Sequence, residues 1–130
     1  MDHITVVIVA RLLLSSVFLG LGGERILVAT GILSGNGNAA TASALALGAV
    51  ELGVGLLLLS GWQLRWVALL VALFLAVDAA VAHPFWRLPG AEQHGQLLHF
   101  LKNVSMVGGF LLLAWVDANE RLGPSPQDGP

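Results

Sequence analysis

The 130-residue sequence contains no cysteine and no tyrosine, and only 11% of its residues are charged. Without cysteine, disulfides, thiol redox chemistry and cysteine metal sites are all excluded. Soluble domains carry about 25% charged residues, so the low charge is a first argument against a soluble fold. Six basic and eight acidic residues leave a net charge of −2, and no basic patch indicates a nucleic-acid partner.

The sequence is instead rich in apolar residues, which make up 56% of it, and its mean hydropathy is +0.82. This composition is typical of a membrane protein. A bilayer core about 30 Å thick needs roughly 20 apolar residues per helix. Because backbone groups in lipid must bond within the protein, we predict an all-α fold, an integral membrane up-down four-helix bundle. The helices are predicted over residues 4–29, 42–61, 64–82 and 97–118.

Turn-forming or polar stretches separate these runs. Residues 30–41 are rich in glycine and asparagine, and residues 85–96 are predicted to form the longest polar loop. Residues 1–118 are therefore predicted to form one transmembrane domain. The tail, residues 119–130, contains three prolines and two glycines and is predicted to be disordered.

The orientation follows from the few basic residues outside the runs. An even number of spans places both termini on the side that carries the connection between the second and third helices. Arg65 and Arg121 mark that side and Arg87 marks the other, so the positive-inside rule predicts cytoplasmic termini. The start of the chain lacks a basic n-region, so the first apolar run is expected to be retained as a spanning helix.

Ionisable residues lie in or at the ends of the apolar runs, where an unpaired charge is costly and often marks a functional site. Three are positive and three negative, a balance that indicates pairing inside the bundle. Two interpretations stay open: the pairs only fix which helices meet, or they serve a function. The six residues are Arg11, Glu24, Arg25, Glu51, Asp78 and Lys102.

Lys102 is the ionisable residue that most needs a partner of opposite charge. It lies about a turn and a half inside the fourth run, where an unpaired ammonium costs roughly 2.5–3.5 kcal/mol. Asp78, on the preceding antiparallel helix, has a similar depth of roughly 8 Å, and Glu51 lies one layer deeper. We therefore predict that Lys102 forms an ion pair with Asp78 or Glu51.

Glu51 lies near the middle of the second run, on one helical face with Gly48 and Gly55. Small residues let helices approach closely in lipid, so this face is predicted to pack against the first and fourth helices. A protonated Glu51 with only a structural role is the alternative. Arg11 also has two interpretations, because it either snorkels to the interface or turns into the bundle.

Histidine offers the remaining candidate ligands. His94 and His99 do not share a helix face, and Pro84 follows His83 directly. We therefore predict no metal site and no intrinsic cofactor; metal binding by the histidines is only a minor alternative, and nothing supports a bis-histidine haem.

Four stretches taken together resemble the DoxX family: RLLLSSVFLGLGGERIL, VELGVGLLLLSG, AVDAAVAHPFW and FLKNVSMVGGFLLLA. The resemblance covers nearly all of residues 11–114. Its most specific motif has an aromatic residue, then Lys102-Asn103, then two glycines that open an apolar run. The positions that match the family pattern are Arg11, Glu51, His83, Lys102 and Asn103.

The resemblance implies a bacterial inner-membrane protein, since some relatives are similar to membrane subunits of quinone-linked oxidoreductases and others to parts of oxidative-stress complexes. The expected function is such a subunit, with a quinone pocket lined by charged residues. Expected partners are the lipid bilayer, redox proteins and further copies of the chain. The alternative is a non-catalytic membrane scaffold or a carrier of small apolar solutes, and no independent catalytic activity is assigned. The candidate ligand-binding and proton-handling residues are Glu51, Asp78, His83, Lys102, Asn103 and Arg11.

Overall fold

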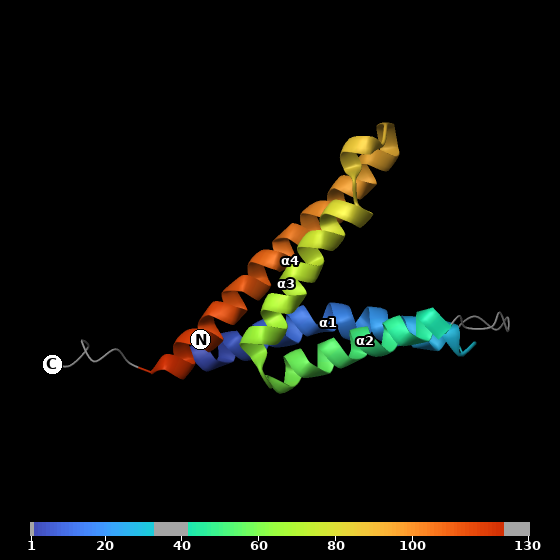
Figure 1. Cartoon of the computed structure of the whole chain (residues 1–130). Coiled ribbons are helices and arrows are strands. Elements are labelled where there is room, and N and C mark those ends of the chain that lie inside the picture. The colour runs from blue at the N-terminus through green and yellow to red at the C-terminus, as the bar shows by residue number, and fades with distance from the viewer. Residues whose placement is uncertain (1, 33–41, 124–130) are drawn as a thin grey trace. The chain divides into compact units, whose positions relative to one another are not determined.

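The computed structural model describes residues 2–32 and 42–123, and these residues form helices and turns without any strand (Figure 1). All four α-helices are long and apolar enough to cross a membrane. The predicted all-α membrane class is therefore confirmed. The helices are α1 (His3–Ala29), α2 (Ala42–Ser60), α3 (Leu64–Ala82) and α4 (Gly90–Leu122), with a short 3-10 helix η1 (Phe85–Arg87) before α4.

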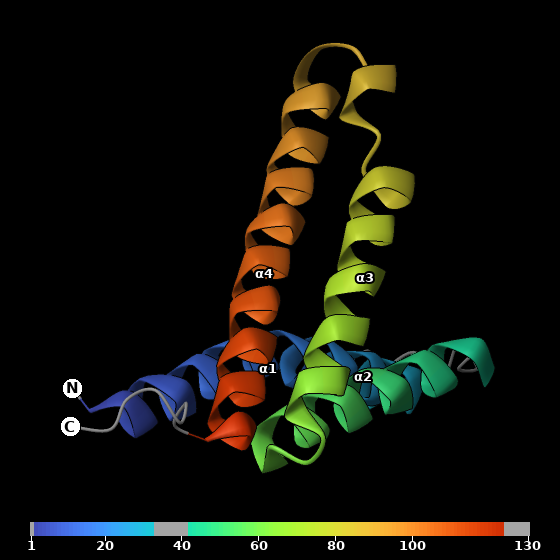
Figure 2. The same ribbon diagram turned by 60° about the vertical axis from the view of Figure 1, so that its left-hand side comes forward.

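The chain divides into two compact units, Met1–Trp62 and Gln63–Pro130. Each unit contains one helical hairpin: α1 packs against α2 in the first, and α3 packs against α4 in the second (Figure 2). In both hairpins, residues early in one helix face residues late in the other, so the helices are antiparallel. The short connections between sequential helices dictate this arrangement.

Glycines let the backbones of α1 and α2 touch. A Cβ added to Gly22 would lie only 2.8 Å from the Gly48 carbonyl oxygen and 2.8 Å from the Leu52 nitrogen. A Cβ on Gly55 would lie 2.7 Å from the Leu19 side chain. Such close van der Waals contact holds helices together in lipid, where no hydrophobic force drives them to associate. The predicted packing of the small-residue face of α2 against α1 is therefore confirmed.

Small and branched side chains provide the packing face of α3. Its buried residues recur every three or four positions and so form one stripe along the helix. On α4, Phe110, Leu113 and Ala114 are buried in the same way. The stripe on α3 consists of Ala68, Val71, Ala72, Leu75 and Ala79.

The start of α4 corrects the sequence prediction. Residues 85–96 were expected to form a polar loop, but the chain forms η1 and then enters α4 at Gly90. Pro89 precedes the helix with an extended backbone, and Glu92 places a negative charge in the first turn, where the helix dipole favours it. Polar residues keep this part of the helix out of hydrocarbon without preventing it from being helical.

The end of α4 also differs from the prediction. The tail was expected to be disordered from residue 119, but the helix continues through Leu122. Gly123 follows with φ 70° and ψ 178°, a backbone conformation that is essentially restricted to glycine, and the helix ends there. The remaining tail, residues 124–130, and most of the predicted loop, residues 33–41, lie outside the described residues.

Adjacent glycines on α1 give a matched test of the α1–α2 contact. We expect Gly22→Ala to destabilise the protein by about 1–3 kcal/mol, the usual cost of overpacking, because the new methyl group meets backbone atoms that cannot move aside. Gly23→Ala should be nearly neutral, since no atom lies within 4 Å of a Cβ at that position. The midpoint of unfolding in a detergent titration measures both. Equal midpoints for the two variants would contradict the packing described.

Candidate functional site

Polar side chains join α3 to α4 near η1. Asn103 Nδ2 donates to Asp78 Oδ2 at 2.7 Å, and His83 Nε2 lies 3.7 Å from the same oxygen. On its other side, His83 Nδ1 lies 2.7 Å from Gln96 Oε1. These four residues, Asp78, His83, Gln96 and Asn103, form a continuous polar path across the hairpin, here called the Asp78–His83 cluster.

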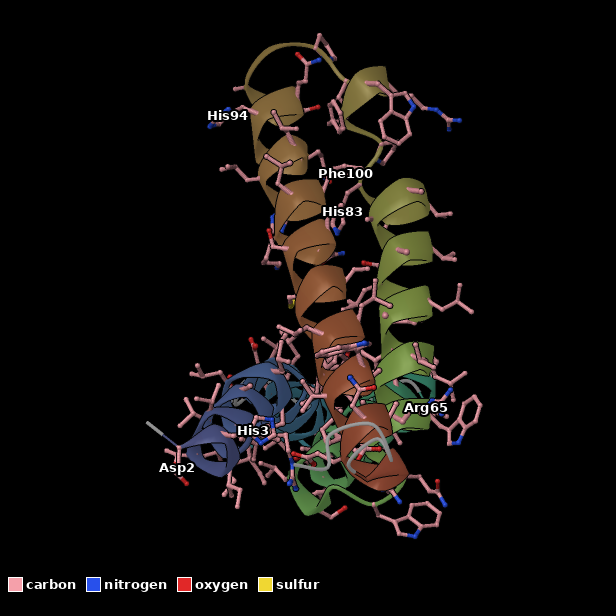
Figure 3. The ribbon with its side chains drawn as sticks, turned by 90° about the vertical axis from the view of Figure 1, so that its left-hand side faces the viewer. Asp2, His3, Arg65, His83, His94 and Phe100 are labelled. Carbon is pink, nitrogen blue, oxygen red and sulfur yellow. The ribbon has the colours of Figure 1, made fainter. Side chains whose placement is uncertain are left out.

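Local structure explains why the cluster forms. His83 is the C-cap of α3, with φ −122° and ψ 56°, and the following Pro84 keeps it from continuing the helix. Its ring therefore turns toward α4 (Figure 3). On α4, Gln96, His99 and Asn103 follow each other at spacings of three and four and so share one helical face. The end of α3 and this face of α4 meet at the cluster.

His83 is held at one nitrogen and open at the other. With the Gln96 oxygen as acceptor, Nδ1 carries the proton of that hydrogen bond. The 3.7 Å between Nε2 and Asp78 exceeds hydrogen-bond length, so Nε2 keeps its capacity to bind another group. The side chains of His83 and Asp78 are 22% and 33% exposed, so both can be reached from outside the hairpin. Asn103 is only 4% exposed.

Aromatic rings surround the same end of the hairpin. The rings of His83 and His99 stack with centroids 5.1 Å apart and planes 17° apart. Phe85, Trp86 and Phe100 meet edge to face, with centroids separated by 5.1 to 6.1 Å. Phe100 contacts Phe85, which follows His83 by two residues, whereas His94 points away from the hairpin (Figure 3). This end of the hairpin therefore combines aromatic rings with a histidine whose Nε2 can exchange a proton.

Two members of this site were missed by sequence reasoning. Gln96 was placed in a loop, and His99 was compared only with His94. The signal that could have found them is the spacing of Gln96, His99 and Asn103 on one face of a helix that begins earlier than predicted. Within the described residues, no group of three histidine, aspartate or glutamate side chains is arranged to hold a metal ion.

The predicted ion pair between Lys102 and Asp78 is wrong. Asn103 bonds Asp78 instead, and Lys102 is exposed, with no ion pair among the described residues. The predicted depth on α4 is right to within one residue, but one residue turns a side chain about 100° around the helix. Helical side chains lean toward the N-terminus, so the long Lys102 stem can carry its ammonium toward the polar start of α4.

Glu51 has a partner within the first hairpin, and the alternative pair of Glu51 with Lys102, which would join the two units, stays a prediction. Arg25 Nε on α1 donates to Glu51 Oε2 at 2.9 Å. Glu51 thus faces α1, as the small residues of its helical face predicted, and it is paired with a cation. Its predicted contact with the fourth helix stays a prediction.

Arg11 turns into the first hairpin and binds the end of α2. Its Nε donates to the Leu58 carbonyl oxygen at 3.0 Å, and Nη2 donates to that of Leu59. These carbonyls would otherwise lack partners at the helix end, where a positive charge is also favourable. Gly61, with φ 72°, leaves room for the guanidinium, since a Cβ there would lie 2.8 Å from Arg11 Nη2.

In the second hairpin, the negatively charged Asp117 binds a backbone N–H group at the start of a helix. Its Oδ2 accepts the backbone N–H of Arg65 at 3.2 Å and so binds the N-terminal end of α3. Arg121, one turn further along α4, donates to the same oxygen at 2.9 Å. Sequence analysis did not select Asp117, because its partner is a backbone group on another helix.

Comparison with known proteins gives the family. The family model for DoxX matches residues 6–84. The chain belongs to the DoxX family. The "Inner membrane protein YphA" of Escherichia coli (strain K12) is 32% identical over 65 residues, which are 50% of the chain and 46% of the relative. The chain thus spans about half the length of this curated relative, and no solved structure matches.

The family match is consistent with the four helices that can span a membrane, and the protein is a DoxX-family inner membrane protein. The matched region ends at residue 84 and so includes Arg11, Glu51, Asp78 and His83. The Lys102-Asn103 motif lies beyond it, so its role rests on the contacts of Asn103. The cytoplasmic placement of the termini stays a prediction.

Adjacent residues on α4 give a matched test of the cluster. We expect Asn103→Leu to destabilise the protein by about 1–3 kcal/mol, because it leaves the Asp78 carboxylate without its hydrogen bond. Lys102→Leu should cost much less, since Lys102 is exposed. Asp78→Leu combined with Asn103→Leu should recover part of the loss, as measured by detergent unfolding. Strictly additive losses in the double variant would remove this pair from the description of the site.

Proposed function

We propose that the Asp78–His83 cluster binds the headgroup of a quinone in a membrane-bound redox system. The observation that carries the proposal is the state of His83, whose ring is fixed through Nδ1 by Gln96 while Nε2 has no hydrogen bond. Because Nδ1 carries the proton of the neutral ring, Nε2 can accept a hydrogen bond from a quinol hydroxyl, and the doubly protonated ring can donate one to a quinone carbonyl. Pre-fixing the ring lowers the entropy lost on binding.

The position of the cluster suits such a ligand. It lies where α3 ends and where the apolar run of α4 gives way to polar residues near Gln96. A quinone has a polar ring on an apolar tail, so its ring is best accommodated at that boundary. Phe85, Trp86 and Phe100 supply flat apolar surfaces close to His83 for the quinone ring.

Asp78 and His83 can also exchange protons with the ligand. Reduction of a quinone to a quinol takes up two electrons and two protons. In this proposal a redox partner protein supplies the electrons, and His83, backed by the Asp78 carboxylate, passes protons at Nε2. Asn103 acts as a positioning residue, because its hydrogen bond holds Asp78 beside His83.

The resemblance to quinone-linked members of the DoxX family points the same way, whereas the relative from Escherichia coli is named only for its membrane location. The alternative is that the protein is a membrane scaffold or a carrier of small apolar solutes. Under that alternative the cluster only joins α3 to α4, and its substitution would leave quinone affinity unchanged.

Two histidines at the same end of the hairpin give the test. We expect His83→Phe, which keeps a stacked ring but removes both nitrogens, to weaken binding of a short-chain benzoquinone about tenfold or more, as loss of a hydrogen bond worth roughly 1.5 kcal/mol would. His94→Phe should have no effect, because His94 points away from the hairpin (Figure 3). Quenching of Trp86 fluorescence, with the other three tryptophans changed to phenylalanine, measures affinity in nanodiscs.

Because quinones also enter the lipid and quench without specific binding, the two variants must be compared in the same nanodiscs. Equal quenching curves for His83→Phe, His94→Phe and the parent protein would reject the quinone site and favour the scaffold or carrier.

A further inference from the structure

We propose that Arg65 and Trp66 form a binding site for the phosphate of an anionic phospholipid, at the end of the α3–α4 hairpin opposite the Asp78–His83 cluster. The site is independent of the quinone proposal. The hydrogen bond from the Arg65 N–H to Asp117 places Arg65 beside that residue of α4. The apolar run of α4, residues 97–116, ends there after a rise of about 30 Å, the thickness of a bilayer core. Arg65 therefore lies at the level of lipid headgroups.

The guanidinium of Arg65 differs from those of Arg11, Arg25 and Arg121. Each of these three is hydrogen-bonded to a carbonyl or a carboxylate. Arg65 Cζ instead lies 5.0 Å from the centroid of the Trp66 ring, and no ion pair of its side chain occurs in residues 2–32 or 42–123. Its five N–H donors match the paired oxygens of a phosphate.

The backbone and the side chain of Arg65 face different partners. Asp117 takes the backbone N–H, and Arg121 shares that carboxylate, so Asp117 is occupied without the Arg65 guanidinium. Figure 3 shows the Arg65 side chain directed away from α4. The cation–π contact with Trp66 holds the guanidinium on the outer surface of the hairpin. Among the described residues of the hairpin no carboxylate pairs with this guanidinium, so an anion from outside the hairpin can bind it.

The aromatic neighbours specify a lipid as the source of that group. Trp66 is 57% exposed, and Trp115, at the same level on α4, is 62% exposed. Exposed tryptophans at the end of a span contact the glycerol and acyl region beneath the headgroups. A phospholipid fits both features, because its phosphate meets Arg65 while its chains meet the rings. Free phosphate would gain nothing from the tryptophans.

The test uses Trp66 as the reporter, with Trp62, Trp86 and Trp115 changed to phenylalanine. The full chain is reconstituted in vesicles of equal phosphatidylglycerol and phosphatidylcholine, in which one lipid at a time carries bromine as a quencher. We expect brominated phosphatidylglycerol to be enriched about fivefold beside Trp66, the preference that one arginine near an anionic headgroup provides. Arg65→Gln should abolish the enrichment while leaving the helix content unchanged, because the backbone bond to Asp117 remains.

The matched control is Arg87→Gln, which removes an arginine from the other end of the hairpin and should leave the enrichment intact. The proposal is overturned if the parent protein shows no enrichment or if Arg65→Gln retains it. Loss of the enrichment in millimolar inorganic phosphate would also overturn it, by showing that the site takes the free anion.

Discussion

A polar group that enters hydrocarbon must find its partner within the protein, and this constraint governs both hairpins of this DoxX-family protein. It applies first to the backbone at helix ends. Arg11 binds the Leu58 and Leu59 carbonyls at the end of α2, and Asp117 binds the Arg65 N–H in the first turn of α3. Each of these helix ends is therefore bound within its own hairpin, each time by a charge of the sign that the helix end favours.

The same constraint explains the side-chain pairs. Glu51 is bonded to Arg25 within the first hairpin, and Asp78 is bonded to Asn103 within the second. Lys102 satisfies the constraint in another way, because a long flexible stem near the end of a span can reach the polar region. In the second hairpin the two ends differ in chemistry: a histidine between an amide and a carboxylate lies at one, and an arginine over a tryptophan at the other.

Apolar run length predicted α1, α2 and α3 to within a residue at each end, because a bilayer imposes a minimum length on every span. The same reasoning placed the start of α4 too late, since the part of a helix outside the lipid needs no apolar residues. Depth along a helix could be counted from the sequence, and it brought Asp78 to the level of residues 102 and 103. The sequence did not show which of these two side chains points toward α3, so Lys102 was predicted as the partner of Asp78 in place of Asn103. Gln96 and His99 became visible only with the contact across the hairpin.

The central claim is that Glu51, Asp78 and the helix ends find their polar partners within one hairpin, and exchanging the charges of Arg25 and Glu51 tests it most directly. Arg25→Glu and Glu51→Arg should each lower the midpoint of detergent unfolding, because each places two like charges together. The double exchange should restore most of the lost stability, since it re-forms the ion pair between positions 25 and 51, now 2.9 Å apart, with the two charges exchanged. The claim would be contradicted if the double exchange were no more stable than the single variants and if Glu51→Lys combined with Lys102→Glu restored stability instead.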